Sequence, residues 1–162
     1  MRFSLQVCYG ICGLFDLAYN GQGGPVQVRV IGDRQQIPPR YLEQIFQRLR
    51  RAELVRSKRG PGGGYTLARA PGEINLRDIV EAIDGPLGQA LPLNPGDREE
   101  TVGRAGAVPT AGPPSFRPDF LWPQLAARFA DLLEEVSVES LCRQAARAAV
   151  NRAGAETYIY QI

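Results

Sequence analysis

Five residues in the middle of the chain carry almost no side chain. Residues 60–64 read Gly-Pro-Gly-Gly-Gly, and Lys58 and Arg59 stand directly before them. Glycine suits backbone with a positive φ or a close approach to another chain, and it weakens a helix or strand that contains it. Residues 54–57 and 65–68 alternate in the manner of short strands. The sequence therefore predicts a hairpin with a basic tip, and three interpretations compete: a phosphate cradle for a nucleotide, a flexible linker, and a β-wing that reaches along nucleic acid.

Helical spacing of apolar residues surrounds this hairpin. Residues 5–19 predict a first helix, capped by Ser4 and ended by Asn-Gly-Gln-Gly-Gly. Its apolar stripe is Leu5, Cys8, Cys12 and Phe15, and Ile11, Leu14 and Ala18 lie beside it. A short helix, a turn at residues 36–38, a helix opened by Pro39 and a helix over residues 76–83 complete the pattern. The order helix, helix, turn, helix, hairpin, helix is that of a winged helix-turn-helix.

The helix opened by Pro39 separates apolar from polar side chains. Its apolar stripe is Leu42, Ile45, Phe46 and Leu49, and its other face carries Arg40, Tyr41, Glu43, Gln44, Gln47, Arg48 and Arg51. The net charge is only +2, so the position of the basic residues matters more than their number. Such a face is either a solvated surface with salt bridges or a surface that reads DNA bases, and the neighbouring basic hairpin favours DNA.

Helix and hairpin together define the candidate DNA contacts. Glu43 can accept a hydrogen bond from a cytosine amine, Gln44 suits adenine, and the basic residues of the hairpin can meet phosphates or enter a minor groove. A nucleotide-binding loop is poorly supported, because no Gly-Lys-Ser/Thr follows the glycines and Tyr65 opens a strand. The expected DNA-binding residues are Pro39, Arg40, Tyr41, Glu43, Gln44, Arg48, Arg51, Ser57, Lys58, Arg59, Gly60, Gly62, Gly63 and Gly64.

The segment RYLEQIFQRLRRAELVRSKRGPGGGYTLARAPGEINLRDIVEAIDGP, residues 40–86, closely resembles the Rrf-two family of bacterial transcription regulators. This family includes iron-sulfur sensors for cluster assembly and nitric oxide and the repressor of cysteine metabolism. The resemblance covers residues 1–86, and FLWPQLAARFADLLEEVSVESL, residues 120–141, is similar to the family's dimerisation helix and the short helix after it. It implies a homodimer on a pseudo-palindromic operator in double-stranded DNA, with recognition helices in major grooves and wings beside minor grooves.

Cysteine and histidine content bears on cofactors and catalysis. The cluster-binding members of the family have three cysteines in the loop after the winged domain, whereas residues 88–116 here contain no cysteine and no histidine. We therefore expect no metal and no other cofactor, and the absence of histidine argues against an enzyme. Cys8 and Cys12 could share a metal or form a thiol sensor pair, and some family members take a ligand from about the place of Cys8. Their apolar stripe favours two small core residues instead, and packing is also expected for Cys142.

Proline content divides the chain. Eight of the thirteen prolines lie between Pro86 and Pro123. We expect a winged helix-turn-helix DNA-binding domain over residues 1–86, an irregular Pro/Gly-rich loop over 87–118, and a dimerisation helix, a short helix and a tail over 119–162. The fold class is mainly α with a small β-wing. The expected dimer interface is Phe120, Leu121, Leu125, Phe129, Leu132, Leu133 and Val136, unless this helix folds back on its own winged domain.

These patterns lead to one main functional expectation. It is a homodimeric, sequence-specific DNA-binding transcription regulator without an iron-sulfur cluster, controlled by a partner protein, a small molecule or thiol oxidation, or by none of these. The alternatives are a regulator with a cysteine-based sensor at Cys8 and Cys12, and a protein-interaction module that kept the fold. With no signal peptide and no apolar run of membrane length, a cytoplasmic protein is expected, with no membrane partner.

Two residues depart from the family pattern in the short second helix. Gln27 stands where a serine-type cap is usual, and Gly32 stands where alanine is usual. Both changes weaken a helix, so we expect this one to depend on the packing of Val28 and Ile31. Pro38 and Pro39 stiffen the turn that follows and offset part of the loss.

Overall fold

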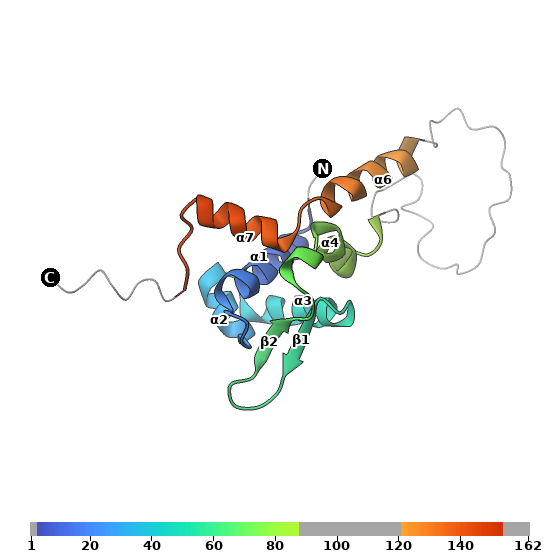
Figure 1. Cartoon of the computed structure of the whole chain (residues 1–162). Helices are drawn as coiled ribbons and strands as arrows, with labels where there is room; N and C mark the ends of the chain where they lie inside the picture. The colour runs from blue at the N-terminus through green and yellow to red at the C-terminus, as the bar shows by residue number, and fades with distance from the viewer. Residues whose placement is uncertain (1–2, 88–120, 154–162) are drawn as a thin grey trace, which may run out of the picture.

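The computed structural model describes residues 3–87 and 121–153 (Figure 1). Its elements are α1 (Leu5–Asn20), α2 (Val28–Gln35), α3 (Pro39–Arg51), β1 (Val55–Lys58), β2 (Gly64–Leu67), a 3-10 turn η1 (Pro71–Glu73), α4 (Leu76–Asp84), α6 (Leu121–Glu134) and α7 (Val138–Arg147). The predicted order and the mainly helical fold class with its small β-wing are confirmed. Residues 88–118, Phe120 and the tail from residue 154 lie outside the described residues.

The two strands begin and end one residue away from the predicted positions. Leu54 donates its N–H to the carbonyl of Leu49, at 2.9 Å, and so continues the turn that ends α3. Its carbonyl accepts from Ala68 at 3.0 Å, which closes the base of the hairpin. The antiparallel ladder then pairs Val55 with Leu67 and Lys58 with Gly64.

Helix α1 buries a different face from the predicted one. Ser4 caps it as expected, accepting from the N–H of Val7 at 3.1 Å. Its buried residues include Val7, Gly10, Gly13, Leu14 and Leu17, whereas Leu5 and Cys8 are exposed. The prediction is wrong for Leu5 and Cys8, whereas Leu14 is buried and Ile11, Cys12 and Ala18 pack against the core. The buried face is displaced because two glycines form contact surface. A side chain at Gly10 would collide with Ile83, and a Cβ at Gly13 would lie 2.8 Å from the ring of Phe46.

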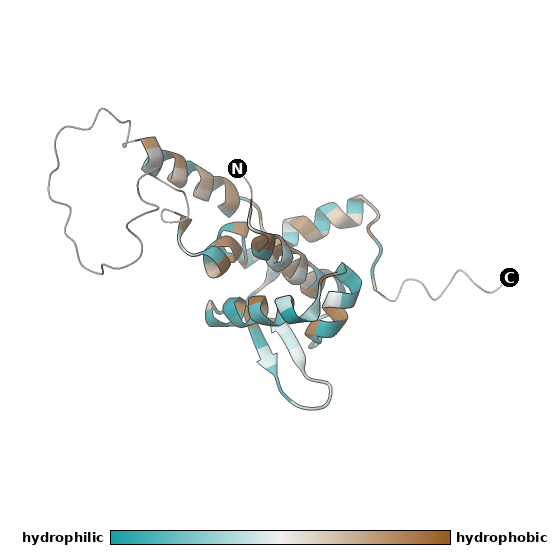
Figure 2. Cartoon of the chain, turned by 180° about the vertical axis from the view of Figure 1, so that it is seen from behind, coloured by the Kyte–Doolittle hydropathy of each residue, from teal (hydrophilic) through white to brown (hydrophobic). Residues whose placement is uncertain are grey.

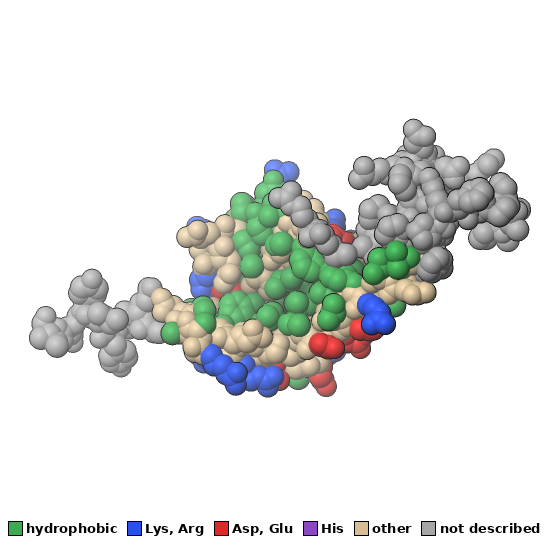
Figure 3. Space-filling view, turned by 90° about the horizontal axis from the view of Figure 1, so that it is seen from above, with side chains coloured by type: hydrophobic (Ala, Val, Ile, Leu, Met, Phe, Trp, Pro, Cys, Tyr) green, Lys and Arg blue, Asp and Glu red, His purple; other side chains and the backbone are tan. Residues whose placement is uncertain are grey.

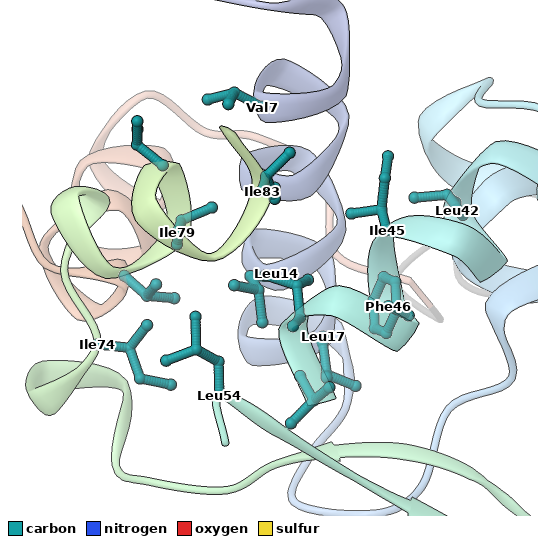
Figure 4. Packing of buried hydrophobic residues seen from close by; sticks show 14 of the residues in the cluster. Val7, Leu14, Leu17, Leu42, Ile45, Phe46, Leu54, Ile74, Ile79 and Ile83 are labelled. Carbon is teal, nitrogen blue, oxygen red and sulfur yellow. The ribbon is translucent and has the colours of Figure 1, made fainter. Parts of the chain in front are cut away.

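The core forms where α1, α3 and α4 meet, and Figure 4 shows its side chains pointing at one another. Leu14 and Leu17 come from α1, and Ile79 and Ile83 come from α4. The apolar stripe predicted for α3 is confirmed, since Leu42, Ile45, Phe46 and Leu49 are all at most 2% exposed. This burial fixes which face of α3 remains outside.

Helix α2 lacks a side-chain cap and is packed against the rest of the fold. Its N-cap Gln27 makes no side-chain cap hydrogen bond, while Val28 and Ile31 are buried. A Cβ at Gly32 would lie only 2.7 Å from the carbonyl oxygen of Ile37, whose N–H donates back to the carbonyl of Gly32 at 2.9 Å. The glycine therefore permits the tight turn into α3.

A buried carboxylate joins α1 to α2. Asp16 is fully buried and forms an ion pair with Arg34 at 2.5 Å. The same carboxylate accepts from the side-chain amides of Asn20 at 2.9 Å and Gln35 at 3.1 Å. A buried charge is stable only when it is paired in this way, so these contacts specify the position of α2 on α1.

The described part of the second half packs on the winged domain. Ala126, Ala130 and Leu133 of α6 are buried, and α6 lies beside α4. Backbone hydrogen bonds join Leu76 to Val136 at 2.9 Å and Val138 to Ile74 at 2.8 Å. After α7 the chain returns to the end of α1, where the hydroxyl of Tyr19 donates to the carbonyl of Val150 at 3.0 Å. Among the helices in residues 3–87 and 121–153, none has the length and apolar character needed to cross a membrane.

Candidate nucleic-acid interface

Helix α3 presents a polar face opposite the core. With 3.6 residues per turn, Arg40, Gln44, Gln47 and Arg51 follow one line along the helix, and all four are exposed. Tyr41 and Glu43 flank this line and are also exposed. In Figure 2 the largely hydrophilic surface of α3 contrasts with the more hydrophobic helices above it. Gln47 was expected on the polar face but was not counted among the DNA contacts, although its spacing of three from Gln44 places it there.

Arg48 was expected to contact DNA, but within the chain its side chain is bound to neighbouring helices. Its guanidinium donates to the carbonyl of Ile83 at 2.9 Å and to the side-chain oxygen of Gln6 at 2.8 Å. The carbonyl of Ile83 is one of the last in α4 and has no partner within that helix. Arg48 therefore ties α3 to α4 and α1, and its half-buried side chain is not offered to an outside partner in the way that Arg51 is.

The hairpin is anchored to the body of the protein beside α3. Tyr65 exchanges backbone hydrogen bonds with Val26, at 2.9 and 2.8 Å, so residue 26 adds a third strand position to the sheet. The ring of Tyr65 packs edge-on against Phe46 with centroids 4.9 Å apart. The wing and α3 thus share one aromatic contact, and Figure 1 shows the hairpin projecting from the end of the molecule that carries α3.

The tip of the wing is a tight turn. Gly63 donates its N–H to the carbonyl of Gly60 at 2.9 Å, which closes a four-residue turn with Pro61 in second place. Gly62, in third place, has a φ of 71°, as a type II turn requires. Gly60 has a φ of 94°. Both positions need glycine for the backbone conformation, and neither glycine has an atom near the place of its missing side chain.

Gly63 and Gly64 are explained by contacts within the chain. A Cβ at Gly63 would collide with the carbonyl oxygen of Lys58, and one at Gly64 would lie 2.5 Å from the backbone of Val26. These glycines were expected to leave room for a sugar-phosphate chain. The contacts within the chain already explain why a side chain is not tolerated at either position.

Four basic side chains on the outer face of α3 and on the wing have no carboxylate partner in the part of the chain that the structure describes. Within the described residues, the ion pairs are Arg34 with Asp16, Arg69 with Asp78, Arg77 with Glu81 and Glu134, and Arg143 with Glu139. Arg40, Arg51, Lys58 and Arg59 are all exposed and take part in none of them. The alternative of a solvated face laced with salt bridges is therefore not what this part of the structure contains.

The expected interface residues on α6 divide into two groups. Leu121, Leu125 and Leu132 are 37%, 44% and 60% exposed. Leu133 is buried within its own chain, and the carbonyl of Val136 accepts a hydrogen bond from Leu76. Phe129 is half-buried, and the centroid of its ring lies 6.1 Å from the centroid of the Phe3 ring. One face of α6 thus folds back on the rest of its own chain, and the other exposes these three leucines together with Arg128.

The three cysteines differ in exposure. Cys8 is exposed, which contradicts its expected place in the core, while Cys12 and Cys142 are half-buried and pack against the core. Burial, followed by the nearby Cys8, raises the pKa of Cys12, and burial raises the pKa of Cys142. Among residues 3–87 and 121–153, no three His, Cys, Asp or Glu side chains come together in a group that could hold a metal ion.

Comparisons with known proteins agree with this architecture. The profile of the Rrf2 family, described as an iron-dependent transcriptional regulator, matches residues 3–144. The HTH-type transcriptional regulator IscR of Xenorhabdus nematophila is 34% identical over 143 residues, which are 88% of this chain and 80% of that protein. The structure of CymR, the global cysteine regulator of B. subtilis, superposes with a TM-score of 0.65 at 26% identity, over 89% of this chain and 98% of that one. IscR of T. potens gives a TM-score of 0.65 at 27% identity, over 94% and 93%. The chain therefore belongs to the Rrf2 family of winged-helix transcriptional regulators.

Proposed function

We propose that the protein binds a pseudo-palindromic operator in double-stranded DNA as a homodimer, without an iron-sulfur cluster. In this proposal α3 lies in the major groove of each half-site and the wing lies against the adjoining backbone and minor groove. The observation that carries it is the polar line of Arg40, Gln44, Gln47 and Arg51 beside a basic wing, all without carboxylate partners in the described residues. Arginine and glutamine are suited to hydrogen bonds with base edges, and lysine and arginine to phosphates.

The dimer is supported by the exposed face of α6. Leu121, Leu125 and Leu132 expose apolar surface to solvent, and the exposed Arg128 lies on the same line of the helix. Figure 3 shows apolar side chains gathered on the face of the molecule opposite the wing. Contiguous apolar surface of this kind marks an interaction site in a soluble protein, and a second copy would place two recognition helices on two half-sites.

The absence of a cluster is supported by the available ligands. The family profile is described as iron-dependent, but the residues of this chain do not fit an iron centre of the family type. The chain has three cysteines and no histidine, and only Cys8 and Cys12 lie within one turn of each other. Anaerobic reconstitution with iron and sulfide should leave the protein colourless. A stoichiometric cluster that is lost in a Cys8→Ala variant would overturn this part of the proposal and make Cys8 a ligand.

The proposed activity is regulatory and involves no catalytic step. It places the protein with the chromosome in the bacterial cytoplasm. The signal would be a partner protein, a small molecule or oxidation of a thiol, for which the exposed Cys8 is the accessible candidate.

Selection from a library of random-sequence duplexes tests the proposal. We expect the full-length protein to enrich a two-fold symmetric sequence and to bind it at least about 1,000-fold more tightly than random DNA, because specific regulators reach such ratios. Affinity should fall steeply with salt, as counterions are released from contacted phosphates. Failure to enrich any sequence would overturn the proposal and would favour a protein-interaction module.

A further inference from the structure

The base of the wing holds an open pocket of about 620 Å³. It lies between the end of α3, the first residues of β1 and the chain that follows β2. Arg50, Arg56 and Arg69 line it, together with Ser57 and Glu53. Arginines from three different segments therefore line one depression, and only Ser57 of these five residues was expected to contact DNA.

The pocket carries an excess of positive charge. Arg69 is paired with Asp78 at 3.5 Å and also donates to the carbonyl of Glu73 at 3.4 Å. Arg50 and Arg56 form no ion pair within the described residues, so the carboxylate of Glu53 stands against two unpaired guanidiniums. Guanidinium groups present forked donors that match the oxygens of a phosphate group. The chemistry of the lining thus suits a phosphate anion.

The position of the pocket suggests where that phosphate comes from. Arg50 donates to the hydroxyl of Ser57 at 3.4 Å, and this contact joins the flank of α3 to β1. The pocket therefore lies in the angle between α3 and the wing. A protein with a helix in a major groove and a wing at the adjoining minor groove must straddle the sugar-phosphate backbone that separates the two grooves.

We propose that this pocket binds a phosphate group, and that in the DNA complex it is a backbone phosphate between the groove read by α3 and the groove beside the wing. The inference rests on the proposed function for the source of the phosphate, but not for the anion site itself. It assigns the contact to Arg50 and Arg56, with Arg69 held beside them by Asp78.

The salt dependence of binding to a random-sequence duplex tests the DNA source, because a phosphate contact does not depend on sequence. The side chain of Arg56 is exposed and makes no hydrogen bond or ion pair within the described residues, so Arg56→Gln should leave thermal unfolding unchanged. It should weaken binding severalfold and reduce the slope of log K against log salt by about 0.9 for each protomer bound. Arg147→Gln is the matched control, since Arg147 is an exposed arginine on α7, away from the wing (Figure 1).

A second measurement tests whether the pocket binds phosphate independently of whether that phosphate belongs to DNA. Inorganic phosphate is titrated into the ¹⁵N-labelled full chain without DNA, at constant ionic strength, while the arginine Nε signals are followed. A saturable shift that is lost in Arg56→Gln supports the anion site. This conclusion holds even if the wild-type protein binds no duplex, although the absence of duplex binding would defeat the proposed function. A saturable shift with an unchanged salt slope assigns the pocket to a free phosphate and overturns the DNA source. If neither the salt slope nor the arginine signals respond, the pocket proposal is wrong while the proposed function can still stand.

Discussion

Helices α3 and α6 each bury one face, but the faces that they leave exposed have opposite chemistry. In α3 the four apolar residues are at most 2% exposed and the outer face is polar and basic. In α6 the buried positions include Ala126 and Ala130, while Leu125 and Leu132 are 44% and 60% exposed. Water can hydrate the polar outer face of α3, whereas the exposed leucines of α6 are unfavourable in water even though Arg128 lies among them. The difference fits the partners proposed above, DNA for α3 and a second copy of the chain for α6.

The largest effect is expected on the inner face of α3. Phe46→Ala removes a fully buried ring that packs against Tyr65 and against the backbone of α1 at Gly13. It should reduce the free energy of unfolding by about 3–5 kcal/mol, as measured by urea denaturation. Gln47→Ala on the outer face of the same helix is the control and should change it by no more than about 0.5 kcal/mol. Equal losses in the two variants would contradict the division of α3 into a core face and a free face.

Acidic residues introduced on the outer face of α6 test whether this face forms the dimer interface. In a Leu125→Asp, Leu132→Asp variant the two carboxylates would be buried against a second copy, with Arg128 of the same helix to share between them. We expect dimerisation to weaken at least about 100-fold, or about 3 kcal/mol, in sedimentation equilibrium. Helical content should remain, because both leucines are exposed within the single chain. A wild-type protein that is monomeric at micromolar concentration, or a variant that stays dimeric, would show that α6 does not form the interface.

The outer face of α3 can be divided further, since a base contact and a phosphate contact fail differently. Gln44→Ala should lower discrimination at one position of each half-site by about 1–3 kcal/mol and leave the salt slope unchanged. Arg59→Ala should weaken specific and non-specific binding together and reduce the salt slope by about 0.9 per protomer if Arg59 meets a phosphate. Anisotropy titrations on the selected operator and on single-base variants of it distinguish these results. If Gln44→Ala keeps full sequence preference, Gln44 does not read a base.

The smallest effect concerns the flank of α3. Arg48→Ala removes the hydrogen bonds to Ile83 and Gln6 and should cost about 1 kcal/mol of unfolding free energy. For the Arg48→Ala variant, the slope of log K for DNA binding against log salt should equal that of the wild type. Arg51→Ala, one turn further along, should show the reverse: unchanged stability and a smaller slope. A reduced salt slope for Arg48→Ala would place this arginine on the DNA after all.

Periodicity predicted the parts of the molecule that depend on neighbours in sequence. The apolar stripe of α3 recurs at helical spacing, and the glycine-rich hairpin follows from residues within about a dozen positions. Local sequence is therefore enough to predict both features. The polar line on α3 follows directly, since a helix whose inner face is fixed has its outer face fixed as well.

What the sequence could not provide are contacts between distant residues. Arg48 looks like any exposed arginine of α3 until its partners, 35 and 42 positions away, are known. Gly10 and Gly13 look like weak points in a helix, whereas they form the surface on which α3 and α4 pack. Asp16 carries no signal of burial, because its three donors come from another turn of α1 and from α2. In each case the deciding partner is brought near by the fold.

Footprinting on the selected operator tests the central claim most directly. Hydroxyl radicals report protected sugars, and methylation of guanine N7 reports contacts in the major groove. We expect two symmetric sites at which guanine methylation prevents binding, separated by whole turns of the double helix, each beside a protected minor groove where the wing lies. Protection confined to the backbone, with no major-groove interference, would contradict the assignment of α3 as the recognition helix.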